Sequence, residues 1–129
     1  MDVMWTSDEL NRIGKAEELQ IASIRSDGTL RKPVIIWVVR IGAALYVRSV
    51  NGRSSAWFRG TQVLLKGHIR AGGIDKDVTY LEEADPGINA QIDTAYRAKY
   101  RRYPSSVDAI NSPAARAATI KLVPRPAGS

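Results

Sequence analysis

Residues 31–40, Arg-Lys-Pro-Val-Ile-Ile-Trp-Val-Val-Arg, form the strongest strand signal in the chain. The six residues from Val34 to Val39 are all β-branched or aromatic, which are the types that strands favour. They do not alternate with polar residues, and this predicts a strand that is buried on both faces. Pro33 has no N–H to give to a sheet ladder, so we expect it near the start of the strand or at a sheet edge.

Hairpin-length connections surround this segment. Gly28 marks a tight turn before it and Gly42 marks one after it, because glycine tolerates the positive φ that such turns need. Short connections favour antiparallel pairing, and six strands in a small domain are expected to curl into a barrel closed between its first and last strands. The other five strands are predicted over residues 19–25, 44–50, 61–70, 77–82 and 119–123.

Helix signals flank the strands. Thr6 and Glu9 have the spacing of a capping box, so a helix is expected to begin there and to run to about residue 18. The main helix is predicted over residues 85–102, with Asp85 as its cap, Pro86 in its first position and Pro104 ending it. Ser112 opens a short helix or turn. The predicted fold is therefore mainly β with α: a six-stranded antiparallel barrel with an N-terminal helix and one long C-terminal helix.

Composition limits the classes of protein that the chain can belong to. Its 129 residues, 44% hydrophobic and 25% charged, fit one globular domain over residues 1–129, with 124–129 as a frayed tail. No stretch approaches the roughly 20 apolar residues of a membrane span, and the first residues do not resemble a signal peptide. The absence of cysteine excludes disulfides and thiolate metal sites, and a single histidine excludes a multi-histidine metal site. A cytoplasmic protein with no metal and no membrane partner is expected.

The charge favours anionic ligands. Nineteen Lys and Arg residues against thirteen Asp and Glu residues give a net charge of +6, which suits phosphorylated cofactors, nucleic acid or anionic lipid. Arg25, Arg31 and Lys32 flank the first hairpin, and Arg48 ends a later strand. We therefore expect most of the anion-binding residues in this half of the chain.

The loop Asn51-Gly52-Arg53-Ser54-Ser55 combines a flexible glycine, a guanidinium and two hydroxyls before a predicted helical turn over residues 54–59. Free N–H groups at a helix start attract phosphate, and arginine adds a charge-assisted clamp. No acidic residue lies between Arg31 and Gly72, which favours Arg53 as a phosphate clamp over a structural ion pair. The alternative is that Ser54 merely caps the turn and the arginines are solvated.

Several other side chains each allow a structural and a functional interpretation. Trp37, in the middle of a strand, is expected in the core, whereas Trp57 is equally suited to the core and to stacking on a ring system. His68 is expected as a surface imidazole, with a role as general base as the alternative. The stripe of Tyr96, Tyr100 and Tyr103 is expected to pack on the barrel; binding of nucleic acid through it is the weaker alternative.

Several segments of the chain resemble the flavin-binding split-barrel superfamily, which includes pyridoxamine-phosphate oxidases and deazaflavin-dependent nitroreductases. The chain more closely resembles a family of short, uncharacterised bacterial proteins within that superfamily. The segments that carry the likeness are Arg31-Lys32-Pro33-Val34, Tyr46-Val47-Arg48-Ser49, Ala56-Trp57-Phe58-Arg59-Gly60, Ile69-Arg70-Ala71-Gly72-Gly73 and Asp77-Val78-Thr79.

The resemblance implies a split barrel, often a homodimer, that holds FMN or a deazaflavin as the cofactor of an oxidoreductase for a small organic molecule. It implies that the backbone from Val34 to Ile36 faces the ring system, beside Trp57 in the Ala-Trp-aromatic segment. The residues it implies for phosphate are Arg31, Lys32, Arg48, Ser49, Arg53, Ser54 and Ser55. Arg59-Gly60 departs from the asparagine and leucine that nitroreductase relatives tend to have.

Two alternatives to a flavin remain open at this stage. A cofactor-free enzyme or binding protein would use the barrel cavity, with Arg48, Tyr96 or His68 polarising the ligand. Some split barrels bind haem instead, and His68 is the one histidine that this sequence offers as a haem ligand.

Overall fold

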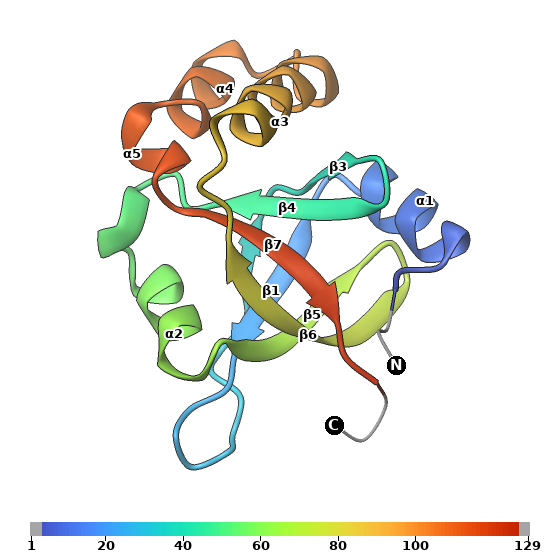
Figure 1. The fold of residues 1–129 in the computed structure, drawn as a ribbon, viewed down its shortest axis with the longest axis vertical. Coiled ribbons are helices and arrows are strands. Elements are labelled where there is room, and N and C mark those ends of the chain that lie inside the picture. Colours follow the sequence, from blue (N-terminus) through green and yellow to red (C-terminus); the bar gives the residue numbers. More distant parts are fainter. Residues whose placement is uncertain (1–3, 127–129) are drawn as a thin grey trace.

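The computed structural model describes residues 4–126 and contains one seven-stranded sheet in the order β2-β1-β5-β6-β7-β4-β3. Every pairing between neighbouring strands is antiparallel. The sheet curls into a half-barrel, with α3, α4 and α5 gathered on one side of it (Figure 1). The strands are β1 (Leu19–Ser23), β2 (Val34–Ile36), β3 (Val39–Ile41), β4 (Ala44–Arg48), β5 (Lys66–Ala71), β6 (Ile74–Glu82) and β7 (Thr119–Pro124).

The predicted strand over residues 31–40 is in fact two strands, which lie at opposite edges of the sheet. β2 pairs with β1 and β3 pairs with β4, yet only Trp37 and Val38 separate β2 from β3. Three residue steps span at most about 11 Å, so the two edges must lie close together. This crossing closes the barrel. The expected closure between the first and last strands is wrong, because β5 and β6 lie between β1 and β7.

Side chains from the end of helix α3 (Pro86–Lys99) stabilise the break between β2 and β3. The Val38 N–H donates to the Tyr100 hydroxyl (3.3 Å), and the Val38 carbonyl accepts from Lys99 Nζ (2.6 Å). The Tyr100 hydroxyl in turn donates to the Glu17 carbonyl (2.7 Å). The Trp37 ring stacks on Tyr100 with a centroid separation of 3.8 Å and an interplanar angle of 6°. Tyrosine and lysine thus replace the hydrogen bonds that a continuous ladder would have given Val38.

The expectation that this segment is buried on both faces holds only for its second half. Val38 and Val39 are fully buried, but Val34 and Ile35 are 36% and 59% exposed. β2 is an edge strand that pairs on one side only, so its apolar residues are left uncovered. The uninterrupted apolar run therefore reflects two different environments rather than one buried strand.

Five helices and one 3-10 helix replace the expected two helices and short turns. The Thr6–Glu9 capping box, the Asp85 cap and the Ser112 cap are confirmed. Pro104, expected only to end the long helix, instead occupies the first turn of the next one. The helices are α1 (Ser7–Lys15), η1 (Gly52–Ser54), α2 (Ala56–Leu64), α3, α4 (Pro104–Ile110) and α5 (Pro113–Arg116).

Helix α2 corrects the predicted strand over residues 61–70, of which only the part from Lys66 is a strand. Ser55, and not Ser54, caps the helix by accepting from the Phe58 N–H (3.4 Å). Gly60 lies in the middle of α2, where a Cβ would come within 3.1 Å of the Arg31 side chain. Packing against the arm between β1 and β2 therefore outweighs the local preference of this segment for a strand.

The buried residues form two clusters on opposite faces of the sheet. One fills the barrel and includes Trp5, whose indole N–H donates to the Leu122 carbonyl (3.0 Å). The other lies between the outer face of β3 and β4 and the helices α3 and α4. Its members are Val39, Tyr46, Ile92, Tyr96, Tyr100, Val107 and Ile110.

The first residues of the predicted frayed tail are instead part of the sheet. Pro124 pairs with Val78 as the last residue of β7, and the Arg125 N–H donates to the Asp77 carbonyl (2.9 Å). Residues 127–129 of the predicted tail lie outside the described residues, as do the first three residues of the chain. Within residues 4–126, no helix has the length and apolar character needed to cross a membrane.

At Gly67 neighbouring groups lie so close to the backbone that there is no room for a Cβ atom. Substitution by alanine should therefore be strongly destabilising. A Cβ there would overlap the Ala22 carbonyl oxygen and the Tyr80 hydroxyl, which are hydrogen-bonded to each other at 2.9 Å. We expect Gly67→Ala to lower the free energy of unfolding by about 3 kcal/mol in urea titrations. Gly14→Ala is the control. It meets only the flexible Arg40 side chain and should stay within about 1 kcal/mol of the wild type. Equal losses in the two variants would contradict this interpretation.

Lys99 should make stability depend on pH. Burial lowers its pKa to about 8, whereas an unfolded chain keeps the ordinary value near 10.5. Between those values the unfolded chain binds more protons, so this lysine makes stability rise with pH. In the wild type, we expect this lysine to raise the free energy of unfolding by less than about 1 kcal/mol between pH 7.5 and 9.5, because the side chain still reaches solvent. Lys99→Met should remove this rise. Urea unfolding at both pH values tests this, with the exposed Lys15→Met as the control. A wild-type slope retained in Lys99→Met would contradict it.

Candidate functional site

Two adjoining hollows beside the edge strand β2 share Val34 and Trp57 and together form what we call the β2 groove. The first hollow, of about 200 Å³, is lined by Ile21, Ser23, Arg31, Lys32, Val34, Ala56 and Trp57. The second, of about 370 Å³, is lined by Val34, Ile35, Ile36, Trp37, Arg48, Val50, Asn51, Trp57, Ser106 and Ile110. The groove therefore has a basic end and a longer apolar part.

Arg31 at the basic end carries a buried donor without a partner. Its backbone N–H donates to the Ser23 carbonyl (2.8 Å), which fixes the start of the side chain. The side chain then packs against Gly60 of α2, and its Nε is buried with no hydrogen-bond partner among the described residues. An unpartnered buried donor on a charged group is costly. An anion bound beside Arg31 and Lys32 would give this guanidinium a charged partner.

The N-terminus of α2 adds positive potential to the same end. Ser55 caps the helix, and its hydroxyl is 2.7 Å from that of buried Ser49. These two serines therefore build the start of the helix rather than line the groove. The following residues, Ala56 and Trp57, do line it, and the first turn of a helix carries free N–H groups and the positive end of the helix dipole.

The apolar part of the groove has flat and aliphatic walls. Trp57 is half-buried between the two hollows and meets Phe58 edge to face, with centroids 6.2 Å apart. Val34 and Ile35 project from β2, and Trp37 lies where β2 ends. These surfaces suit a planar ring system, which gains from stacking and from burial of apolar area. Val34, Ile36 and Trp57, all predicted site residues, are brought together here.

Arg48, predicted to hold phosphate, is instead the centre of a buried network. Its side chain is 0% exposed and donates to Asp93 (2.6 Å), Thr119 (2.9 Å), Asn89 (2.8 Å) and Asn111 (3.0 Å). Burial alone raises the pKa of the Asp93 carboxyl, but hydrogen bonds and charge from Arg116 and Arg48 outweigh it and hold that pKa below its usual range. Arg48 borders the groove, yet its guanidinium is fully committed to joining β4, β7, α3 and α4.

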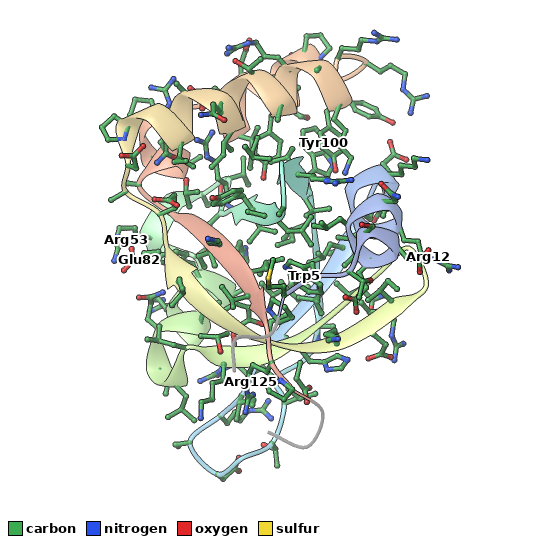
Figure 2. All side chains as sticks on the ribbon, turned by 45° about the vertical axis from the view of Figure 1, so that its right-hand side comes forward. Trp5, Arg12, Arg53, Glu82, Tyr100 and Arg125 are labelled. Carbon is green, nitrogen blue, oxygen red and sulfur yellow. The ribbon has the colours of Figure 1, made fainter. Side chains whose placement is uncertain are left out.

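Arg53, predicted as the phosphate clamp, lies outside the β2 groove. It forms an ion pair with Glu82 of β6, donates to the Ala117 carbonyl (2.9 Å) and lies over the Phe58 ring at 5.0 Å (Figure 2). No acidic residue lies near Arg53 in the sequence, but the fold supplies Glu82 from another strand. Ser54 lies beside it in η1, exposed, with its hydroxyl 3.5 Å from the Asn51 carbonyl.

The two candidate catalytic residues also lie outside the groove. His68 on β5 has Nδ1 2.8 Å from Asp77 and Nε2 bonded to Asp75. Partial burial lowers the pKa of His68, but the two carboxylates outweigh it and raise the pKa overall. Tyr96 is fully buried in the outer cluster, its hydroxyl has no hydrogen-bond partner among the described residues, and burial raises its pKa.

The tyrosine stripe packs on the barrel, as predicted. Tyr96 and Tyr100 are buried, so their rings are not available for stacking on bases. Tyr103 is partly exposed and donates to the Glu17 carboxylate (2.9 Å).

Sequence reasoning missed several groove residues, because they come from segments far apart in the chain. Ser23 enters from the end of β1, Val50 and Asn51 from the turn after β4, and Ser106 and Ile110 from α4. The helical Gly60 was the one local signal, since a glycine inside a helix indicates close packing of another group.

The sequence matches a family described as an uncharacterised protein conserved in bacteria (DUF2255) over residues 9–122, and the chain belongs to this family. A comparison with proteins of curated function found none that matches.

Solved structures share the fold at low sequence identity. The conserved hypothetical protein Rv2991 of Mycobacterium tuberculosis is 12% identical with a TM-score of 0.66, over 97% of this chain and 83% of its own. HutZ, the haem storage protein of Vibrio cholerae, is 14% identical with a TM-score of 0.63, over 95% and 92%. An FAD-binding protein of Mesorhizobium loti is 17% identical with a TM-score of 0.56, over 98% and 94%. The chain shares the split-barrel fold of these solved structures, which is the fold that the sequence motifs indicated.

Removing the centre of the buried network should destabilise the fold. In Arg48→Met, Asn89, Asn111 and Thr119 lose their shared donor, and Asp93 keeps only its half-exposed partner Arg116. We expect the free energy of unfolding to fall by about 3–5 kcal/mol, as when one partner of a buried pair is removed. Arg116→Met is the matched control, because it removes the exposed partner of the same carboxylate and should cost much less. Similar losses in the two variants would show that the network is not centred on Arg48.

Proposed function

We propose that this member of the DUF2255 family binds a flavin or deazaflavin in the β2 groove and is an oxidoreductase acting on a small organic molecule. The observation that carries the proposal is the buried, unpartnered Nε of Arg31 at the basic end of a groove with aromatic and aliphatic walls. A flavin phosphate is an anion of the kind this donor lacks, and a flavin ring is a planar group of the kind these walls suit.

Different residues of the β2 groove would contact the phosphate and the ring of such a cofactor. Arg31, Lys32 and the N–H groups of Ala56 and Trp57 would hold the phosphate. The segment from Val34 to Ile36 and the Trp57 side chain would bind the ring and exclude water from it. Ser49 and Ser55 contribute indirectly, because they fix the start of α2.

The lining of the groove also fits a cofactor that performs the chemistry itself. Among the described residues that line the two hollows there is no histidine, aspartate or glutamate to act as a general acid or base. A bound flavin supplies hydride transfer, and the protein then provides binding, orientation and a dry site.

A second copy of the chain is the partner that we propose for the open side of the groove. Val34, Ile35 and Val50 line the groove and are still 36%, 59% and 46% exposed. β2 also has an unpaired edge. A homodimer would cover these apolar residues and keep water away from the ring.

A cofactor-free enzyme or binding protein is the weaker alternative. It depends on Arg48, Tyr96 or His68 to polarise a ligand. Arg48 is fully hydrogen-bonded within the buried network, Tyr96 is buried, and His68 lies outside the groove. Haem ligation through His68 is also disfavoured, because both of its ring nitrogens are bonded to carboxylates.

The test is the absorbance spectrum of the purified protein, followed by fluorescence titration with FMN, FAD, a deazaflavin and riboflavin. We expect Arg31→Gln to weaken FMN binding by about 1.5–3 kcal/mol, the contribution of a hydrogen bond to a charged group. Riboflavin has no phosphate and loses all of these contacts, so it should bind the wild type at least as weakly as FMN binds the variant.

Arg53→Gln is the matched control, because it removes the same charge outside the groove, and it should leave FMN affinity unchanged. A colourless protein with no response to any of these ligands would eliminate the flavin proposal. Equal losses in Arg31→Gln and Arg53→Gln would place the phosphate elsewhere.

A further inference from the structure

Four large apolar side chains project into solvent at one end of the molecule, and we call them the apolar tip. They are Leu30 on the arm between β1 and β2, and Val63, Leu64 and Leu65 at the end of α2, and they are 48%, 51%, 43% and 41% exposed. The arm and the end of α2 lie at the same end of the barrel (Figure 1). They are joined there, because Ile24 bridges to Leu30 and its N–H donates to the Lys66 carbonyl (3.0 Å).

The backbone at Leu65 does not favour a leucine at this position. Leu65 ends α2 in the left-handed conformation (φ 56°) and is the one non-glycine residue with positive φ in the described chain. Glycine or asparagine normally occupies such a helix end, since a bulky side chain is strained there. The fold would therefore accept a small or polar residue at this position, and burial gives no reason for an apolar one.

Basic residues surround the apolar tip. The two segments that form it, residues 24–33 and 59–66, contain five basic residues and one acidic residue, a net +4 in a chain of net +6. Arg25, Arg59 and Lys66 are exposed. The acidic residue, Asp27, is bonded to the N–H and hydroxyl of Thr29 (3.0 and 2.6 Å). Arg31 and Lys32 line the basic end of the β2 groove, so Arg25, Arg59 and Lys66 are the basic residues that belong to the apolar tip.

We infer that the apolar tip docks on the surface of an anionic lipid bilayer. A set of protruding aliphatic side chains ringed by lysine and arginine matches such a surface, since the aliphatic groups enter the headgroup layer while the cations bind phosphates. Nucleic acid would use the cations but not the aliphatic side chains. The expectation of no membrane partner was based on the absence of a spanning segment, and contact with a membrane surface does not need one.

Vesicle flotation tests this directly, with vesicles of phosphatidylcholine alone and with about one-third phosphatidylglycerol added. We expect the wild type to bind only the anionic vesicles and to lose at least about tenfold in affinity on going from low salt to roughly 0.3 M salt. The double variant Leu64→Ser, Leu65→Asn should bind at least about tenfold more weakly. Its melting temperature should not fall, because asparagine tolerates the left-handed conformation. Arg59→Gln with Lys66→Gln should also weaken binding.

Leu81→Ser is the matched control, since Leu81 is 45% exposed on β6 and lies outside the tip segments. It should bind vesicles as the wild type does. The inference is overturned if the wild type does not bind anionic vesicles at low salt, or if the tip variants bind as well as the wild type. It is also overturned if those variants dissociate a dimer without changing vesicle binding, because the tip would then be a subunit contact. FMN affinity in the tip variants should be unchanged, so this test is independent of the proposal for the β2 groove.

Discussion

The hydroxyl of Tyr100 accepts from the backbone of Val38 and donates to the backbone of Glu17, and much of the architecture depends on this contact. It gives the backbone of Val38 a hydrogen-bond partner at the point where the chain passes from β2, at one edge of the sheet, to β3, at the other edge. Because β2 and β3 separate there, the sheet curls, and β2 is left with an open edge. Tyr100, at the end of α3, thereby helps to create the β2 groove beside Trp37. Tyr100 itself does not line the groove.

Three arginines that look alike in the sequence have three different roles in the structure. Arg48 is buried and fully bonded, Arg53 forms a surface ion pair with Glu82, and Arg31 keeps a buried donor that has no partner within residues 4–126. Arg48 and Arg53 meet partners that are 29 to 71 residues away in the chain, so local sequence did not separate them. The unpartnered donor is what sets Arg31 apart from the two structural arginines, and it becomes visible only in three dimensions.

The parts of the fold that were predicted correctly are those that depend on neighbouring residues. The Thr6–Glu9 capping box, the Asp85 and Ser112 caps and the Gly28 and Gly42 turns all involve contacts within a few positions. The errors involve distant contacts: the break at residues 37–38 depends on Tyr100, and α2 extends to Leu64 because Gly60 packs against Arg31. At the β2 groove, Arg31, Lys32 and Trp57 were expected from two separate motifs and line the same hollow, whereas the contribution of α4 was not expected because α4 is distant in the chain.

The crossing between β2 and β3 has a consequence for the order of folding. The hairpins β1–β2 and β3–β4 form from nearby residues, but in the finished sheet β5, β6 and β7 lie between them. A chain that has emerged only as far as β4 therefore holds both edges of the barrel and none of its middle. Its apolar inner face stays open until β7 is made and pairs with both β6 and β4. Because such long-range pairing is slow, the nascent chain passes through a stage at which its exposed apolar face is open to aggregation.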